Sequence, residues 1–394
     1  MPRIARLLIP LSIAALLAGP PSTAAAGSGP SLYLRLRHEN VDDAALARRA
    51  EATTYRLRLG HLFEISPRWS GFLEAEHTGH LFGERYNSTA NGAAGFPTVA
   101  DPDNTELNQA WARLRQGPLA ATLGRQRLNL GNQRFVGAVG WRQNEQTFDA
   151  LDLQFAFDGP SLRYVYLDRV NRVFGAEHPN PLLARWDLDT HVVEATTTLG
   201  PGRLAILGLW LDNRSLPDAS HRNLGLRYEG SLSIGEAPAL DFVAEFAQQR
   251  PHADGLGGNR ANFTSAELGT RLAAGQFRIG LERLGGDGRY AFQTPLATLH
   301  AFNGWADRFL TTPPHGLRDL WLGWNRGFGS VMASLRLHRF EADQGGARYG
   351  DELDASLGWK VDAQWNVLFK VAHYRSEGFA SDVDKAWVSV EYAF

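Results

Sequence analysis

The residues of this chain best suited to chemistry are arginines that stand at the polar positions of short alternating segments. Arg58, Arg227 and Arg336 each lie between two apolar neighbours in such a segment. Arginine stays cationic in proteins, and its planar guanidinium binds carboxylates through two parallel hydrogen bonds. Glu245 and Glu282 occupy similar polar positions and would moderate the positive field. Spaced arginines of this kind predict a surface along which an anion exchanges one weak contact for the next.

β-Strands must position these arginines, because the polarity alternates with a period of two. Side chains on a strand point in turn to opposite faces, so each segment has one apolar face and one polar, charged face. We count about eighteen candidate strands. The alternation is clearest at residues 32–37, 55–59, 151–155, 224–229, 277–282 and 331–338.

The connections between these segments alternate between short and long. The short connections lie at residues 116–118, 158–160, 200–202, 274–275, 327–329 and 361–363, and the long ones at 78–105, 128–146, 171–187 and 285–316. This rhythm is typical of an up-and-down antiparallel sheet with tight turns at one rim and large loops at the other. Outer-membrane barrels have short periplasmic turns and longer extracellular loops.

A soluble sandwich and a transmembrane barrel would both produce the alternation. In the sandwich the apolar face is the core, whereas in the barrel it meets lipid and the charges line the lumen. Ten tilted residues span ~25 Å, the height of a lipid-facing band, and a charge facing mid-bilayer lipid would cost ~2–4 kcal/mol. The leader, the loop rhythm and the C-terminus favour an all-β transmembrane barrel, and sixteen to eighteen strands predict an aqueous channel.

The N-terminus has the pattern of a secretory leader. Arg3 and Arg6 precede an apolar run at Leu7–Leu17, and Ala24–Ala26 offers a cleavage site. A retained helical anchor is the alternative, but the apolar run is shorter than the ~20 residues that a span needs. We therefore expect a signal peptide at residues 1–26 and a single barrel domain at 27–394, exported to the outer membrane.

Composition excludes several classes of function. The chain has 40 basic and 42 acidic residues, and the leader holds two of the basic ones, so the mature net charge of −4 argues against nucleic acid as a partner. The absence of cysteine excludes thiolate metal sites and disulfides. Asp101–Glu106 is acidic enough for calcium but lacks the glycine of an EF-type loop, which favours a polar turn. We expect no metal and no cofactor.

The last eight residues form an alternating strand that ends on an aromatic residue. Val388, Val390, Tyr392 and Phe394 share one face. This ending resembles the C-terminal signal that outer-membrane assembly machinery recognises. We therefore expect outer-membrane lipids and that machinery as partners of a monomeric barrel.

Three longer runs carry a more specific resemblance. Residues 124–149, 170–175 and especially Phe292–Asp307 resemble the alginate-export family of outer-membrane barrels, and the likeness extends over the mature chain. The resemblance implies an eighteen-stranded pore with an arginine-rich constriction that passes an anionic polyuronate. About 368 mature residues are few for polymer export, so diffusion of smaller anionic or sugar-like solutes fits equally well.

Alternation and resemblance together define a predicted pore-lining set. Strict alternation places Arg125 and Arg127 on the lipid face, and either a bulge at Gly124 or a position above the membrane would resolve this conflict. The predicted set is Arg58, Arg125, Arg127, Arg142, Asp152, Arg169, Arg172, Arg227, Glu245, Glu267, Arg271, Glu282 and Arg336.

Two other functions remain open. Serine, histidine and acid residues on different strands could form a barrel enzyme acting on lipid or envelope polysaccharide, although no catalytic motif is present and we expect no enzyme. A purely structural or adhesive barrel would need a filled lumen. For each single arginine, an Arg–Glu ladder that only braces the wall is the competing interpretation.

Overall fold

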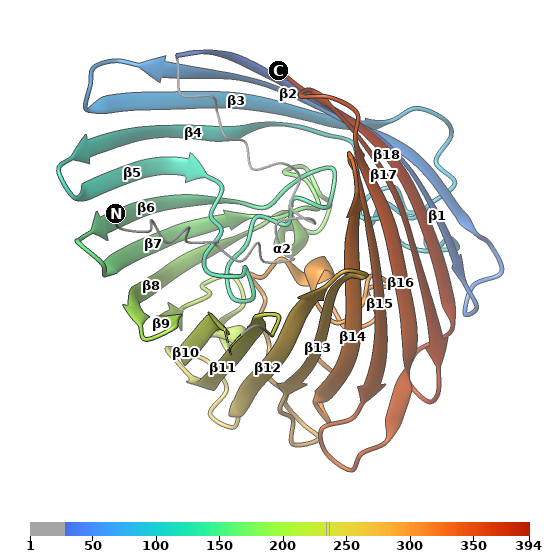
Figure 1. Cartoon of the computed structure of the whole chain (residues 1–394). Helices are drawn as coiled ribbons and strands as arrows, with labels where there is room; N and C mark the ends of the chain where they lie inside the picture. Colours follow the sequence, from blue (N-terminus) through green and yellow to red (C-terminus); the bar gives the residue numbers. More distant parts are fainter. Residues whose placement is uncertain (1–27, 234, 236) are drawn as a thin grey trace.

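The computed structural model describes residues 28–233, 235 and 237–394, so the predicted signal peptide lies outside the described residues. Eighteen antiparallel strands form one sheet in which each strand pairs with its neighbours along the chain (Figure 1). The strands are β1 Gly29–Asp43, β2 Ala50–Glu64, β3 Trp69–His80, β4 Asn104–Gln116, β5 Leu119–Gln126, β6 Thr147–Ala156, β7 Ser161–Asn171, β8 Arg185–Leu199, β9 Gly202–Leu211, β10 His221–Leu232, β11 Leu240–Pro251, β12 Ala261–Leu272, β13 Gly275–Leu284, β14 Leu317–Phe328, β15 Val331–Glu341, β16 Arg348–Lys360, β17 Trp365–Ser376 and β18 Val383–Ala393.

The sheet closes on itself through its first and last strands. β1 pairs with β18 along its length, and beyond the last paired residues Leu32 and Phe394 exchange backbone hydrogen bonds of 3.0 and 2.9 Å. Closure leaves no free edge, which is the condition for a sheet that crosses a bilayer. The predicted eighteen-stranded barrel is thereby confirmed.

The two faces of the wall differ in the sense expected for a barrel in lipid. On β2, Leu59 is 56% exposed, whereas the neighbouring Arg58 is 5% exposed. Leu123, Leu224 and Ile279 are likewise exposed on the outside. A soluble sandwich would bury the leucines and expose the arginines, so this alternative is excluded.

The connections follow the predicted rhythm, and two of the long ones fold into the barrel. Residues 127–146 and 285–316 lie inside the ring of strands (Figure 1). Their aromatic side chains bury against the wall: the Phe135 ring lies 6.2 Å from those of Phe263 and Phe292. The core of this molecule is therefore inside the lumen, between the loops and the wall.

Helical structure is minor and lies in the connections. α2 Pro181–Ala184 is capped by the Asn180 side chain, which accepts a hydrogen bond from the backbone N–H of Leu182, and η1 Pro217–Ala219 and η2 Leu299–Ala301 are single turns. None of the helices in the described part of the chain has the length and apolarity to cross a membrane.

Candidate functional site in the lumen

Four arginines on β1 and β2 form a ladder on the lumenal face. Arg35 and Arg56 stand directly opposite each other, and Arg37 and Arg58 extend the row above and below them. The ladder is the docking surface for the connection 127–146. Arg35 Nη2 donates to the carbonyl oxygen of Arg142 at 2.5 Å, and Arg56 donates to the same oxygen and to that of Gln143. Arg37 donates to the carbonyl oxygen of Trp141 in the same loop. All four arginines are buried as a result.

Buried carboxylates complete this docking. Arg58 pairs with Glu76 on β3 and with Glu145 of the loop, whose Oε2 lies 3.0 Å from Arg58 Nη2. Arg127 pairs with the same Glu145 and with Glu74, 2.7 Å away. Burial opposes ionisation of Glu145, but Arg127 and Arg58 outweigh it and lower its pKa from 4.5 to about 2. The loop therefore carries a permanent negative charge into a row of cations.

Asp307 anchors the second inward loop, 285–316, to β18, the strand next to β1. Its carboxylate lies 2.9 Å from Lys385 Nζ on β18 and 3.1 Å from Arg142 Nη2, and His300 Nδ1 lies 2.6 Å from it. Burial would raise the pKa of Asp307, but His300, Lys385 and Arg142 hold it well below its usual value. Burial lowers the pKa of His300 from 6.5 to about 3, so its ring is neutral and donates its Nδ1–H.

The same loop makes further contacts with β16 and β17. The backbone N–H of Ala306 donates to Glu352 at 2.7 Å, and that of Trp305 donates to Asp354 at 3.2 Å. Lys370 on β17 is fully buried, with its ammonium 3.8 Å from the Trp305 ring centroid and 4.0 Å from that of Trp141. Cation–π contacts of desolvated lysine are among the stronger ones. This part of the wall is closed to a solute.

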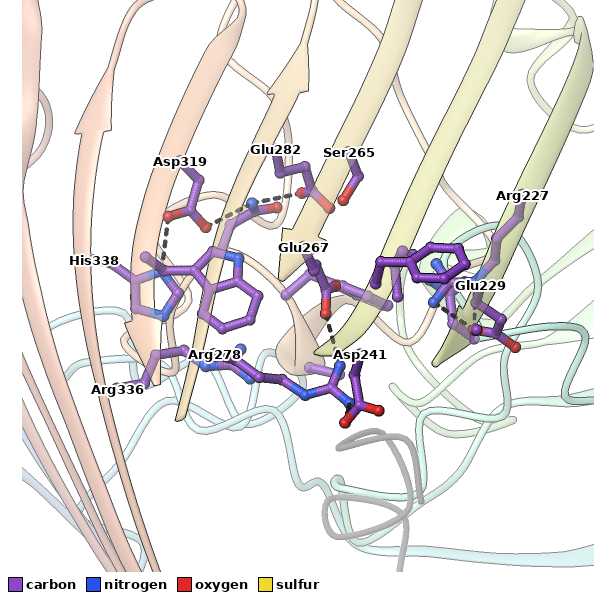
Figure 2. Close-up of a pocket in the computed structure, with 18 residues that line it drawn as sticks. Arg227, Glu229, Asp241, Ser265, Glu267, Arg278, Glu282, Asp319, Arg336 and His338 are labelled. Carbon is purple, nitrogen blue, oxygen red and sulfur yellow. Dashed lines mark hydrogen bonds and ion pairs between the residues drawn. The ribbon is translucent and has the colours of Figure 1, made fainter. Parts of the chain in front are cut away.

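A hollow remains on the other side of the lumen, between β10–β15 and the two loops. Its empty volume is about 950 Å³ when the space open to solvent is included. Figure 2 shows its charged side chains converging from neighbouring strands. Those from the wall are Arg227, Glu229, Asp241, Glu267, Arg278, Glu282, Asp319, Arg336 and His338.

The arginines of the hollow differ in how far they are neutralised. Arg227 lies 2.6 Å from Glu245 and 3.0 Å from Glu229, and Arg278 lies 3.1 Å from Glu267. The Arg336 guanidinium instead lies 4.5 Å from the Trp321 ring centroid. Within the described residues no carboxylate lies within 4 Å of it, so Arg336 retains the capacity to bind an anion.

The structure brings most of the predicted set to the lumenal side of the barrel. Arg127 reaches it because β5 ends at Gln126 and the chain then turns inward. Arg271 faces the lumen near the rim of the short turns and is exposed. The set on the lumenal side is Arg58, Arg127, Arg142, Asp152, Arg227, Glu245, Glu267, Arg271, Glu282 and Arg336.

Two predicted residues lie elsewhere, and their assignment to the pore is corrected. Arg125 keeps the strict alternation of β5 and pairs on the outer face with Asp149 at 2.7 Å. Arg169 joins the same outer row, 3.5 Å from Asp149 and 2.9 Å from Asp187. The row stands at the ends of strands near the long connections, where a charge avoids mid-bilayer lipid.

Arg172 also lies outside the hollow. It sits in the external connection after β7, with its guanidinium 4.1 Å from the Trp186 ring centroid and Nη1 donating to the carbonyl oxygen of Leu182. Arg172 thereby links α2 to the wall, because its guanidinium lies on the ring of Trp186 in β8 while one of its donors binds Leu182 in α2.

Several lumenal residues were missed. Arg35 and Arg37 occupy the polar positions of the first alternating segment, and Arg278 those of 277–282, so the same signal as for Arg58 would have found them. Lys370 alternates with Phe369 and Val371 on β17. Among the described residues, no group of three or more His, Asp or Glu is arranged to hold a metal ion.

The closed wall, lipid-facing exterior and charged, loop-narrowed lumen define the fold of an outer-membrane porin. The family model described as alginate export matches residues 31–172, which confirms the resemblance over that stretch. The match includes the 124–149 run and the first half of the 170–175 run, whereas Phe292–Asp307 lies beyond it. No curated protein sequence matches the chain.

Solved structures of bacterial outer-membrane proteins share the fold over nearly the whole chain. OccK9 (OpdG) of Pseudomonas aeruginosa is similar with a TM-score of 0.74 at 17% identity, covering 93% of this chain and 98% of its own. OpdK of the same organism, described with vanillate, has a TM-score of 0.70 at 16% identity with the same coverage. OccAB3 of Acinetobacter baumannii has a TM-score of 0.73 at 13% identity, covering 94% and 99%. At these identities the similarity establishes the fold.

Proposed function

We propose that the protein is an outer-membrane channel for small anionic solutes, with carboxylated sugars as the preferred class. The observation that carries this proposal is Arg336 in the lumenal hollow. Its guanidinium lies against Trp321 and has no carboxylate partner in the described residues. A guanidinium that rests on an aromatic ring and has no paired carboxylate keeps its N–H donors available for the carboxylate of a sugar acid.

The chemistry of the comparisons supports the same class. Alginate, named by the matching family model, is a polymer of uronic acids, and vanillate, named with OpdK, is a small carboxylate. The two share the carboxylate group, which the planar guanidinium of arginine binds through paired hydrogen bonds.

The loops inside the lumen favour a small solute over a polymer. Residues 127–146 and 285–316 are held there by buried ion pairs, so they narrow the lumen and leave the hollow beside β10–β15 open. Export of a polyuronate would require both loops to leave the lumen. Polymer export is therefore the alternative to small-solute passage within the same proposal.

Conductance of the purified barrel in a planar bilayer tests the proposal. We expect anion selectivity in a salt gradient, and block of the chloride current by glucuronate but not by glucose. Charge-assisted hydrogen bonds contribute roughly 1.5–3 kcal/mol, so Arg336→Gln is expected to weaken glucuronate block roughly tenfold or more. The selectivity should also decline near 1 M salt, where the screening length is about 3 Å.

Arg339→Gln is the matched control, because Arg339 lies three residues further on β15 and points outward, 3.5 Å from Asp351. This variant should leave block and selectivity unchanged. Cation selectivity of the wild type, or identical block of wild type and the Arg336 variant, would refute the proposal and favour arginines that only brace the wall.

A further inference from the structure

Three arginines stand side by side on the outer wall near the rim of the long connections, and no carboxylate of the described residues pairs with them. Arg222 on β10 and Arg250 on β11 are direct partners across the strands. Gln249 pairs with Ala261, and continuing this register by one residue brings Arg260, just before β12, opposite Arg250. We call Arg222, Arg250 and Arg260 the rim cluster.

The rim cluster borders the lipid-facing part of the wall. Arg222 shares its face with Leu224 and Leu226, which are 50% and 49% exposed, and Arg250 shares its face with Phe246. The strands β10, β11 and β12 lie side by side in the barrel wall (Figure 1). The cluster thus stands where an apolar surface gives way to the aqueous rim.

This sector brings three adjacent arginines together, and within the described residues none of the three has a paired carboxylate. Like charges directly opposite each other on a sheet are destabilising. Two outward arginines elsewhere near the same rim are compensated: Arg125 lies 2.7 Å from Asp149, and Arg283 lies 2.5 Å from Asp343. Across the described part of the chain no acidic side chain lies within 4 Å of any member of the rim cluster. The positive charge there is available to a ligand.

We infer that the rim cluster binds the phosphate groups of lipopolysaccharide, the phosphorylated glycolipid of the outer leaflet. Guanidinium forks match phosphate oxygens in pairs, and side chains on directly opposite residues are ~5 Å apart, close enough to share one phosphate. Basic clusters at the membrane surface recognise anionic headgroups, and here the exposed leucines below would receive the acyl chains. The inference goes beyond the channel function and rests on the external position of the long connections.

The arginines point away from the lumen, so a solute that passes through the pore is a poorer candidate. A free anion would use the guanidinium groups but gain nothing from the apolar wall beneath them. A phosphorylated lipid is thus distinguished from a pore solute by the outward arginines, and from a free anion by the apolar wall.

Native mass spectrometry of the full-length mature barrel in mild detergent tests the inference. The probes are diphosphoryl lipid A, the same lipid after dephosphorylation, and inorganic phosphate. We expect wild type to bind diphosphoryl lipid A and to bind the dephosphorylated lipid roughly tenfold or more weakly, since each charged hydrogen bond is worth about that factor. Inorganic phosphate at millimolar concentration should not compete.

The variants are a triple Arg222→Gln, Arg250→Gln, Arg260→Gln protein, the corresponding triple lysine protein, and Arg339→Gln as control. The glutamine variant should lose binding, the lysine variant should retain part of it, and the control should match wild type. Unheated gel mobility and bilayer conductance should be unchanged in all of them, which separates this test from that of the channel. Binding that ignores phosphorylation or survives the triple glutamine change would overturn the inference, and so would full competition by inorganic phosphate.

Discussion

Replacement of Asp307 by asparagine is expected to release the 285–316 loop from the wall and to raise the conductance of the channel. The Asp307 side chain is 6% exposed and lies between Lys385 and Arg142, at 2.9 and 3.1 Å. Asparagine keeps the shape and removes the charge. Asp307 has a φ of 62°, a conformation that asparagine also tolerates, so the substitution adds no backbone strain.

The magnitude follows from the burial of the two cations. Removing one partner of a buried ion pair costs ~3–5 kcal/mol, because the other charge is left uncompensated. With ~1.4 kcal/mol per factor of ten, the ratio of docked to released loop should fall by a factor of roughly 10² to 4 × 10³. The strands themselves keep their hydrogen bonds, so the barrel should remain folded.

Two measurements check this expectation. Single-channel conductance should rise, and trypsin should cut after Arg308, which in the docked loop lies 2.9 Å from Asp43. Asp287→Asn is the control in the same loop, since Asp287 accepts 2.8 Å hydrogen bonds from the backbone N–H groups of Arg289 and Tyr290, and asparagine can replace it. Wild-type conductance together with wild-type resistance to trypsin in the Asp307 variant would refute the reasoning.

Three further expectations concern pH, backbone and topology. Burial lowers the pKa of His300 from 6.5 to about 3, so protonation of His300 destabilises the docked loop below pH 6.5, increasingly as the pH falls. The pKa of Glu145 is lowered from 4.5 to about 2, so the stabilisation that its charge provides is also lost as the pH falls below 4.5. Conductance should therefore rise on acidification, and a fall would contradict both assignments. Gly124→Ala should lower the free energy of unfolding of the barrel by roughly 1–3 kcal/mol, because Gly124 has a φ of 123° and a Cβ there would overlap the backbone of β4. Thermal stability followed by the mobility of the folded barrel on gels checks this, and equal stability of variant and wild type would show that the strand can shift. An epitope tag at Gly257 should be reachable on intact cells and one at Gly202 should not, and the reverse result would invert the topology.

The strand pattern could be predicted from the sequence because each strand obeys a local rule. A charge on the lipid face is costly, so polar and apolar residues alternate within every strand without reference to the others. The inward positions of Arg58 and Arg336 follow from this rule. Arg125 follows it as well and lies on the outer face beside Asp149, so its assignment to the pore, which rested on the family resemblance, was wrong.

The sequence by itself determined the eighteen strands, the alternating faces and the two kinds of rim, because these depend on residues adjacent in the chain. Only the tertiary structure decided which lumenal arginines are covered and which are open. Arg35 meets the carbonyl oxygen of Arg142, and Lys385 meets Asp307, across 107 and 78 residues of chain. No local pattern encodes such contacts, because they depend on how two loops pack inside a closed wall. Arg336 remains available for the same reason, since no loop carboxylate of the described chain reaches it.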